Sequence, residues 1–207
     1  IVYPDRLPHA LIARIDAAIL EFRYWMDEPG NDVQWYFSEN HALLFHTSAY
    51  LAGNLLPDAR VRRSDRDGAA QSRVGYERLM SWFDHFETSE MAEFNSGTYF
   101  PIDLKGLTAL FALAHDADIR ARAKAAIVRL ITMVAHSAHH GVITGAQGRS
   151  YEHSLCVADT LELTGLARLL WGQGNFGAHA NCLAQIALAL RDYGLDLPDL
   201  AEIANWT

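Results

Sequence analysis

Three short segments of the sequence combine aromatic rings with side chains that can transfer protons or bind anions. They are residues 35–41 (WYFSENH), 93–99 (EFNSGTY) and 148–153 (GRSYEH). Carboxyl, imidazole and phenol groups act as general acids or bases, and arginine binds carboxylates. The segments also recur at a regular interval, since Glu39, Asn95 and Tyr151 are spaced 56 residues apart. The sequence therefore predicts three related polar sites, whose chemistry depends on the elements that position them.

Apolar residues recur with the 3.6-residue period of an α-helix along most of the chain, and strand signals are almost absent. Ser38 is a suitable N-cap, because its hydroxyl can accept hydrogen bonds from first-turn amides, and Pro57 forbids continuation of that helix. Residues 58–68 are predicted to form a solvated loop. The expected helices span residues 8–26, 39–55, 70–88, 118–136, 154–171 and 178–193, with one more beginning at Pro101. We expect an all-α fold of about seven helices.

Counted along the chain, the second, fourth and sixth expected helices begin at about residues 39, 101 and 154. Each of them is directly preceded by one of the polar segments. A repeat of helix pairs places the starts of similarly oriented helices at one end of the structure. If the pairs curve into a ring, the three segments converge at one mouth. The competing interpretation is that three loops of any α-protein contain polar residues.

Composition excludes several classes of protein. The 207 residues include 25 acidic and 17 basic ones, and a net charge of -8 disfavours a general nucleic-acid binder. Half of the residues are hydrophobic, so we expect a single domain over residues 1–207. Cys156 and Cys182 are too few for a disulfide framework, and no apolar run reaches the ~18 residues of a membrane span. The chain does not begin with Met, so we expect a piece of a longer protein, and its compartment and oligomeric state stay open.

The three segments, together with residues 43–46, 49–53 and 136–137, resemble bacterial α/α-toroid proteins of the six-hairpin, carbohydrate-active type. These include heparinase II-like and alginate-lyase-like polysaccharide lyases and uncharacterised relatives. The resemblance covers roughly residues 10–155 and is specific for the toroid. A full toroid needs about twice as many residues, which implies an incomplete ring, a fragment or a smaller variant.

Such lyases commonly carry an Asn-His pair, a Tyr and an Arg at the mouth. The resemblance implies that Asn40, His41, Arg149 and either Tyr151 or Tyr99 fill these roles. Lyase chemistry removes the proton on the carbon next to a uronate carboxylate, so donors must stabilise the developing enolate. Asn40 and His41 in a first helical turn favour an anion there. His41 is then a candidate base, and Tyr151 is a candidate acid, or a base if Arg149 lowers its pKa from about 10.

Two other kinds of chemistry can be weighed from the same residues. A hydrolase needs two carboxyls about 5 to 9.5 Å apart, and Glu39, Glu93 and Glu152 supply candidates, although each also suits a helix start. A metal site is not expected, because the histidines at 136, 139 and 140 offer an i, i+3 pair without an HExxH motif or a cysteine pair. No cofactor is expected either.

The expected function is therefore cleavage of a uronate-containing polysaccharide by β-elimination. Candidate catalytic residues are Glu39, Asn40, His41, Glu93, Arg149 and Tyr151, and candidate substrate-binding residues are Trp35, Tyr36, Asn95, Tyr99, Glu152 and His153. The expected partner is a poly- or oligosaccharide, with no nucleic acid and no membrane. Two alternatives stay open: an inverting glycoside hydrolase that uses Glu39 and Glu93, and a non-catalytic helical-repeat module that binds a sugar or a protein.

Overall fold

The structure is a computed structural model that describes residues 4–156, 161–178 and 181–205. Helices take up 59% of it and strands 4%, which confirms the predicted all-α class. The residues divide into two compact units, Ile1–Trp82 and Phe83–Thr207, and each is described by itself. Within the described residues, no helix is long and apolar enough to span a membrane.

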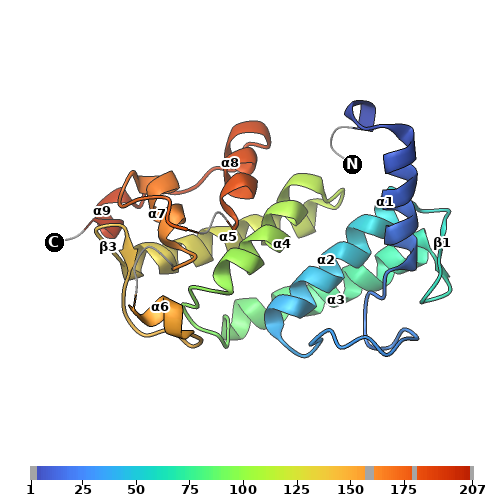
Figure 1. Cartoon of the computed structure of the whole chain (residues 1–207), viewed down its shortest axis with the longest axis horizontal. Coiled ribbons are helices and arrows are strands. Elements are labelled where there is room, and N and C mark those ends of the chain that lie inside the picture. Colours follow the sequence, from blue (N-terminus) through green and yellow to red (C-terminus); the bar gives the residue numbers. More distant parts are fainter. Residues whose placement is uncertain (1–3, 157–160, 179–180, 206–207) are drawn as a thin grey trace. The chain divides into compact units, whose positions relative to one another are not determined.

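The elements follow one another from a short 3-10 helix at Pro4–Arg6 to a last helical turn near the end of the described chain (Figure 1). The helices are α1 (His9–Glu21), α2 (Glu39–Leu55), α3 (Gly68–Ser89), α4 (Phe100–Leu113), α5 (Ala117–Ser137), α6 (Glu152–Cys156), α7 (Thr164–Trp171), α8 (Leu183–Asp192) and α9 (Ala201–Ala204). The strands form two antiparallel pairs, β1 (Arg60–Val61) with β2 (Arg66–Asp67), and β3 (Ala138–His139) with β4 (Val142–Ile143).

In the first unit, α2 and α3 form a close antiparallel hairpin, and glycines make the close approach possible (Figure 1). A Cβ atom on Gly53 would lie 2.3 Å from the carbonyl oxygen of Gly68 and 2.5 Å from the amide nitrogen of Ser72. Farther along, a Cβ on Gly75 would lie 2.6 Å from the amide nitrogen of Tyr50. All three distances are shorter than a van der Waals contact, so the two backbones touch where a side chain would separate them.

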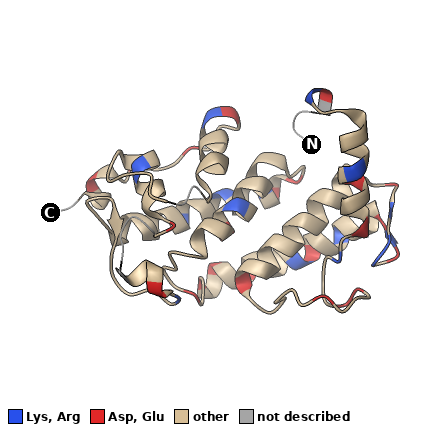
Figure 2. Cartoon of the chain, viewed as in Figure 1, with Lys and Arg blue, Asp and Glu red and all other residues tan. Residues whose placement is uncertain are grey.

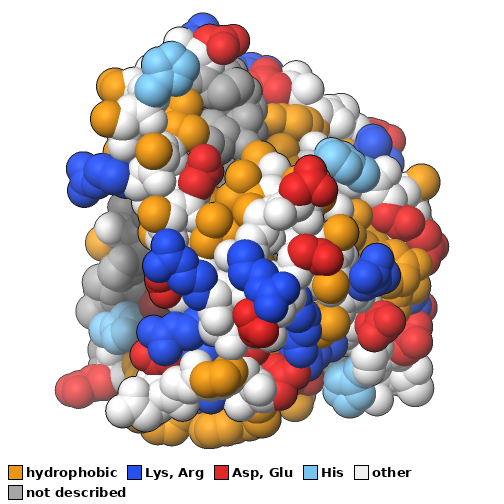
Figure 3. All heavy atoms as spheres, turned by 90° about the vertical axis from the view of Figure 1, so that its right-hand side faces the viewer, with side chains coloured by type: hydrophobic (Ala, Val, Ile, Leu, Met, Phe, Trp, Pro, Cys, Tyr) orange, Lys and Arg blue, Asp and Glu red, His pale blue; other side chains and the backbone are white. Residues whose placement is uncertain are grey.

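The β1–β2 hairpin closes one end of this unit against α1. Tyr24, Ala49 and Val61 form a small buried core there. The arginines of the hairpin pair with nearby acidic groups, as in the ion pairs of Arg60 with Asp65 and of Arg62 with Glu21. Figure 2 shows acidic and basic residues interleaved along the chain, and Figure 3, which faces the α1 and β1 side, shows them alternating on the surface. This face is therefore locally neutralised.

In the second unit, α4 and α5 form another hairpin, and α8 packs on α4 while α9 packs on α5. The interface is apolar because both helices place a stripe of residues on one side at the helical period. Asp116 caps α5, since its side chain accepts from the amides of Asp118 and Ile119. Fully buried side chains of this core include Phe100, Leu104, Leu107, Leu110, Ile119, Ile127 and Leu130.

Several predicted boundaries need correction. The first helix ends at Glu21 instead of residue 26. The amide of Tyr24 donates to the Glu28 carboxylate at 2.7 Å, so it does not make the backbone bond that would continue the helix. The predicted helix 154–171 is not continuous: α6 and α7 are separate, residues 161–163 are not helical, and 157–160 lie outside the described residues. The predicted helix 178–193 is shorter, as α8 begins at Leu183, and part of the loop at 58–68 forms the β1–β2 hairpin.

Candidate functional site

The second and third polar segments lie side by side in the second unit. The amide of Gly148 donates to the carbonyl of Phe94 at 2.6 Å, and the amide of Gly97 donates to Oε1 of Gln147 at 3.2 Å. A Cβ on Gly148 would lie 2.7 Å from the Phe94 amide nitrogen, so only glycine permits this approach. Two segments that are more than 50 residues apart in the sequence are thereby joined along their backbones.

Their side chains form a group that we call the tyrosine cluster: Glu93, Tyr99, Arg149, Tyr151 and His153. The hydroxyls of Tyr99 and Tyr151 are 2.8 Å apart, and Nη1 of Arg149 lies 3.4 Å from the Tyr151 hydroxyl. Arg149 also forms an ion pair with Glu93 at 3.1 Å. Its guanidinium stacks over both tyrosine rings, with centroid distances of 5.5 and 5.9 Å. Arg149, Tyr151 and His153 are exposed, so solvent and ligands reach the cluster.

The contact between the two hydroxyls affects the proton of Tyr99. The hydrogen bond with Tyr151, with partial burial as a second cause, raises the pKa of the Tyr99 phenol to about 12. Tyr99 therefore stays protonated near neutral pH and can donate to the Tyr151 oxygen. When Tyr99 is the donor, the Tyr151 oxygen lies within reach of two donors, the Tyr99 hydroxyl and the Arg149 guanidinium, which can stabilise negative charge that develops there.

Behind the cluster lies a carboxylate that the sequence analysis missed. Oε1 of Glu162 is 3.2 Å from Nε2 of His153 and accepts from Oγ1 of Thr98 at 3.5 Å. The ring of His153 in turn stacks on that of Tyr151, with centroids 5.9 Å apart and planes 5° from parallel. Glu162 was missed because the apolar period predicts it inside a continuous helix, whereas it lies in the turn before α7.

Asn95 and Glu152, two of the expected substrate-binding residues, lie in different surroundings: Asn95 is buried and Glu152 is exposed. Asn95 is 2% exposed and has a left-handed backbone with φ of 52°, a conformation that asparagine tolerates. Its Nδ2 donates to the carbonyl of Ala146 at 3.4 Å, so Asn95 joins the second segment to the residues just before the third. Glu152 is exposed at the start of α6, where a ligand can reach it.

The first polar segment belongs to the other unit, so its expected convergence with the second and third stays a prediction. Within it, Ser38 occupies the N-cap position of α2 as predicted, but its hydroxyl does not bond to a first-turn amide. Instead, Oγ lies 2.5 Å from Nδ1 of His41 and 3.5 Å from the carbonyl of Trp35. The hydroxyl thus orients the half-buried imidazole of His41, at the expense of a helix cap.

The other residues of this segment separate into exposed and buried ones. Trp35 is 60% exposed and can stack on a sugar ring. Tyr36, the second predicted stacking residue, is 7% exposed, because its ring packs against Trp25 and Phe45, and we remove it from the candidate site. Asn40 is also buried, and its Oδ1 has no hydrogen-bond partner among the described residues. The carbonyl of Glu39 accepts from Nε1 of Trp82 at 3.1 Å.

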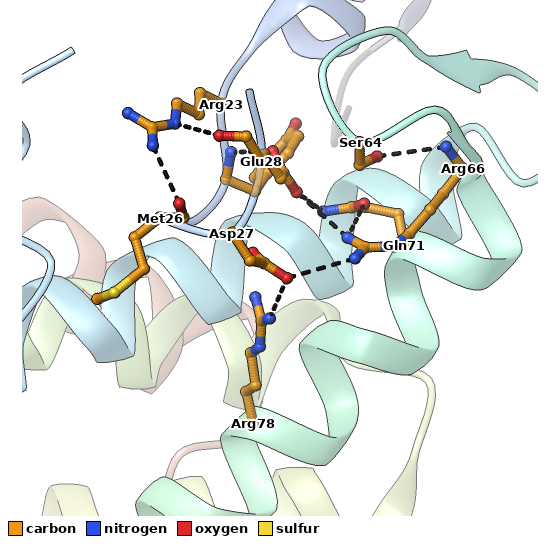
Figure 4. A network of polar contacts seen from close by, with 9 residues as sticks. Arg23, Met26, Asp27, Glu28, Ser64, Arg66, Gln71 and Arg78 are labelled. Carbon is orange, nitrogen blue, oxygen red and sulfur yellow. Dashed lines mark hydrogen bonds and ion pairs between the residues drawn. The ribbon is translucent and has the colours of Figure 1, made fainter. Parts of the chain in front are cut away.

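A network of buried and half-buried charges anchors the loop that leads to this segment (Figure 4). The Glu28 carboxylate, whose side chain is fully buried, accepts from Nε2 of Gln71 at 2.9 Å and from Nη1 of Arg66 at 3.4 Å. Partial burial acts to raise the pKa of the Asp27 carboxyl, but its ion pairs with Arg78 and Arg66 together outweigh this effect and lower the pKa. The loop from α1 to α2 is thereby tied to the β1–β2 hairpin and to α3.

Other features of the structure lie apart from these residues. A cavity of about 520 Å³ lies beside α5, lined by Phe86, Arg122, Arg129 and Met133 among others, and none of its lining residues belongs to the tyrosine cluster. The rings of His139 and His140 meet edge to face, with their centroids 4.3 Å apart and their planes 66° from parallel. Among the described residues, no group of three or more His, Cys, Asp or Glu side chains is arranged to hold a metal ion.

Comparison with known proteins adds no family to this description. No protein-family model, no curated protein and no solved structure matches the chain. The assignment of a function therefore depends on the chemistry of the side chains described above.

Proposed function

We propose that the chain acts in the cleavage of a uronate-containing polysaccharide by β-elimination, and that the tyrosine cluster performs the proton transfer. The observation that carries the proposal is the pair of tyrosine hydroxyls 2.8 Å apart beside the Arg149 guanidinium. One phenol of such a pair can exchange a proton while the other donor and the cation stabilise the charge that develops.

The reaction breaks the C–H bond next to the uronate carboxylate and the C–O bond to the leaving sugar, and it forms a C=C bond between the two carbons. A base takes the proton, and an acid supplies one to the leaving oxygen, so no water is consumed. Because the Tyr151 hydroxyl contacts both the Tyr99 hydroxyl and the Arg149 guanidinium, we assign the proton transfer to Tyr151 and the supporting hydrogen bond to Tyr99.

Arg149 has a second role in this proposal. One side of its guanidinium is neutralised by Glu93, and the group is half exposed, with 48% of the side chain accessible. Its remaining N–H groups can bind a carboxylate, which is the group that a uronate presents next to the reacting carbon. Since Glu93 is held by Arg149, it supports the arginine in our proposal and does not act as the acid of a hydrolase.

His41, in the first unit, is a separate candidate for proton transfer. If Ser38 donates its hydrogen to the Trp35 carbonyl, its oxygen accepts from Nδ1–H of His41, and Nε2 then carries the lone pair. The exposed ring of Trp35 offers a stacking surface in the same segment. This arrangement favours glycan binding as well as proton transfer.

The test is a screen of uronate-containing and neutral glycans with the protein and with two variants. Elimination leaves an unsaturated uronate that absorbs ultraviolet light, whereas hydrolysis leaves only new reducing ends. We expect ultraviolet-absorbing products, and a loss of about 100- to 10,000-fold in turnover for Tyr151→Phe. Tyr193→Phe, outside the cluster, is the matched control and should retain turnover.

Reducing ends without ultraviolet absorbance would reject the lyase in favour of a hydrolase. Near-normal turnover of Tyr151→Phe would remove the cluster from the reaction. Binding of glycans without any cleavage would support the binding-module alternative.

A further inference from the structure

Glu162 is a buried acid that the proposed reaction does not use. Its side chain is 9% exposed, and Oε2 has no hydrogen-bond partner among the described residues. Burying a carboxylate with an unsatisfied oxygen is unfavourable, and an apolar side chain in this turn would avoid the penalty. A residue of this kind beside a polar cluster points to a role in the site.

The contacts of Glu162 lead directly to Tyr151. Its Oε1 contacts Nε2 of His153 at 3.2 Å, and Thr98 donates to the same oxygen at 3.5 Å. His153 lies almost parallel to the Tyr151 ring, 5° away in plane angle. The Glu162 carboxylate, the His153 imidazole and the Tyr151 phenol thus contact one another in series, and the Tyr151 hydroxyl in turn contacts that of Tyr99.

Tyr151 needs such support because its own surroundings are open. It is 38% exposed and lies just before α6, which is only five residues long. A phenol on a short element can adopt several rotamers, and proton transfer requires one of them. A ring held flat against one face restricts this freedom.

We infer that Glu162 is a positioning residue, which holds His153 against Tyr151 and so keeps the phenol in its reactive orientation. The role in turnover rests on the proposed function, whereas the placement of the three side chains does not. Glu162 touches neither substrate nor reacting atoms in this arrangement, and it acts only through His153.

The experiment compares Glu162→Ala and Glu162→Gln in the full chain, with the exposed Glu202→Gln as control. Nuclear magnetic resonance follows the Nε2 proton of His153 and the proximity of the His153 and Tyr151 rings. Both signals should be present in the wild type, lost in Glu162→Ala, and restored in Glu162→Gln, because an amide oxygen still accepts the bond. In parallel, kcat of Glu162→Ala should fall about 100-fold with little change in KM, and Glu162→Gln should recover most of it.

Ring contacts that survive in Glu162→Ala, or a Gln variant as impaired as the Ala variant, would overturn the inference. If Glu162→Ala does not fold, His153→Ala takes its place, and unchanged kcat in that variant would equally overturn it. If the wild type cleaves no glycan, the proposed function fails, and the ring contacts alone then decide whether Glu162 sets the position of Tyr151.

Discussion

His46 makes the stability of the first unit dependent on pH. Its ring is 6% exposed, lies 4.3 Å from that of Trp25, and feels the positive charge of Arg78. Burial, and secondarily Arg78, lowers its pKa from 6.5 to about 4, although Asp27 acts in the opposite direction. The folded protein therefore holds this imidazole in its neutral form.

The sign and size of the effect follow from this shift. Between the folded and unfolded pKa values the unfolded chain binds more protons, so stability is full above pH 6.5 and falls as the pH drops toward 4. Lowering the pH from about 7.5 to about 5 should cost about 2 kcal/mol in the free energy of unfolding through this one residue.

Urea unfolding of the wild type and of His46→Gln, followed by tryptophan fluorescence and circular dichroism, measures the difference. The variant cannot gain a proton at this position, so its loss of stability over the same pH interval should be smaller by about 2 kcal/mol. His9→Gln, which removes an exposed histidine of α1, should leave the pH dependence almost unchanged. Equal losses in the wild type and in His46→Gln would refute the argument that the ring is buried in its neutral form.

Three further substitutions test the packing and the charge network by urea unfolding. Gly53→Ala should destabilise the protein by about 1 to 3 kcal/mol, because the new methyl group overlaps the α3 backbone. The control, Ser48→Ala on the exposed side of α2, should not destabilise it. A Gly53→Ala variant that is more stable than the wild type would contradict the close approach of the two helices. Glu28→Ala should lower the free energy of unfolding by about 3 to 5 kcal/mol, because it leaves buried donors and an arginine without their acceptor. The control Glu21→Ala removes an exposed ion pair and should cost at most about 1 kcal/mol. A cost for Glu28→Ala as small as that of Glu21→Ala would show that the network is not needed for stability. Asp116→Ala should cost about 1 kcal/mol through the lost cap of α5, and an unchanged midpoint would mean that water replaces the cap.

Local patterns determined the helices well where the apolar period and the chain breaks agree. The bounds of α2 match the predicted 39–55, because a polar segment precedes it and Pro57 follows it. The prediction was wrong where hydrogen bonds from a side chain competed with the helix. Glu28 captures the amide of Tyr24 and ends the first helix early, and Glu162, which bonds to His153 and Thr98, lies in the turn where the sixth was expected to continue.

The same distinction holds for the candidate site. The regular spacing of the polar segments predicted that they are related, and residue type together with the resemblance to α/α-toroid lyases singled out Tyr99, Arg149 and Tyr151. Which hydroxyl meets which, and that Tyr99 keeps its proton, depends on distances between segments that no local pattern encodes.

Sequence by itself therefore determined the all-α class, most helix positions and the residue types available for proton transfer, because these depend on periodicity and on side-chain chemistry. Only the tertiary structure decided that Tyr36 is buried, that the Ser38 hydroxyl bonds to His41 instead of capping its helix, and that Glu162 contacts His153. The physical reason is that burial and hydrogen-bond partners are set by residues far apart in the chain, which compete with the local preferences of each segment.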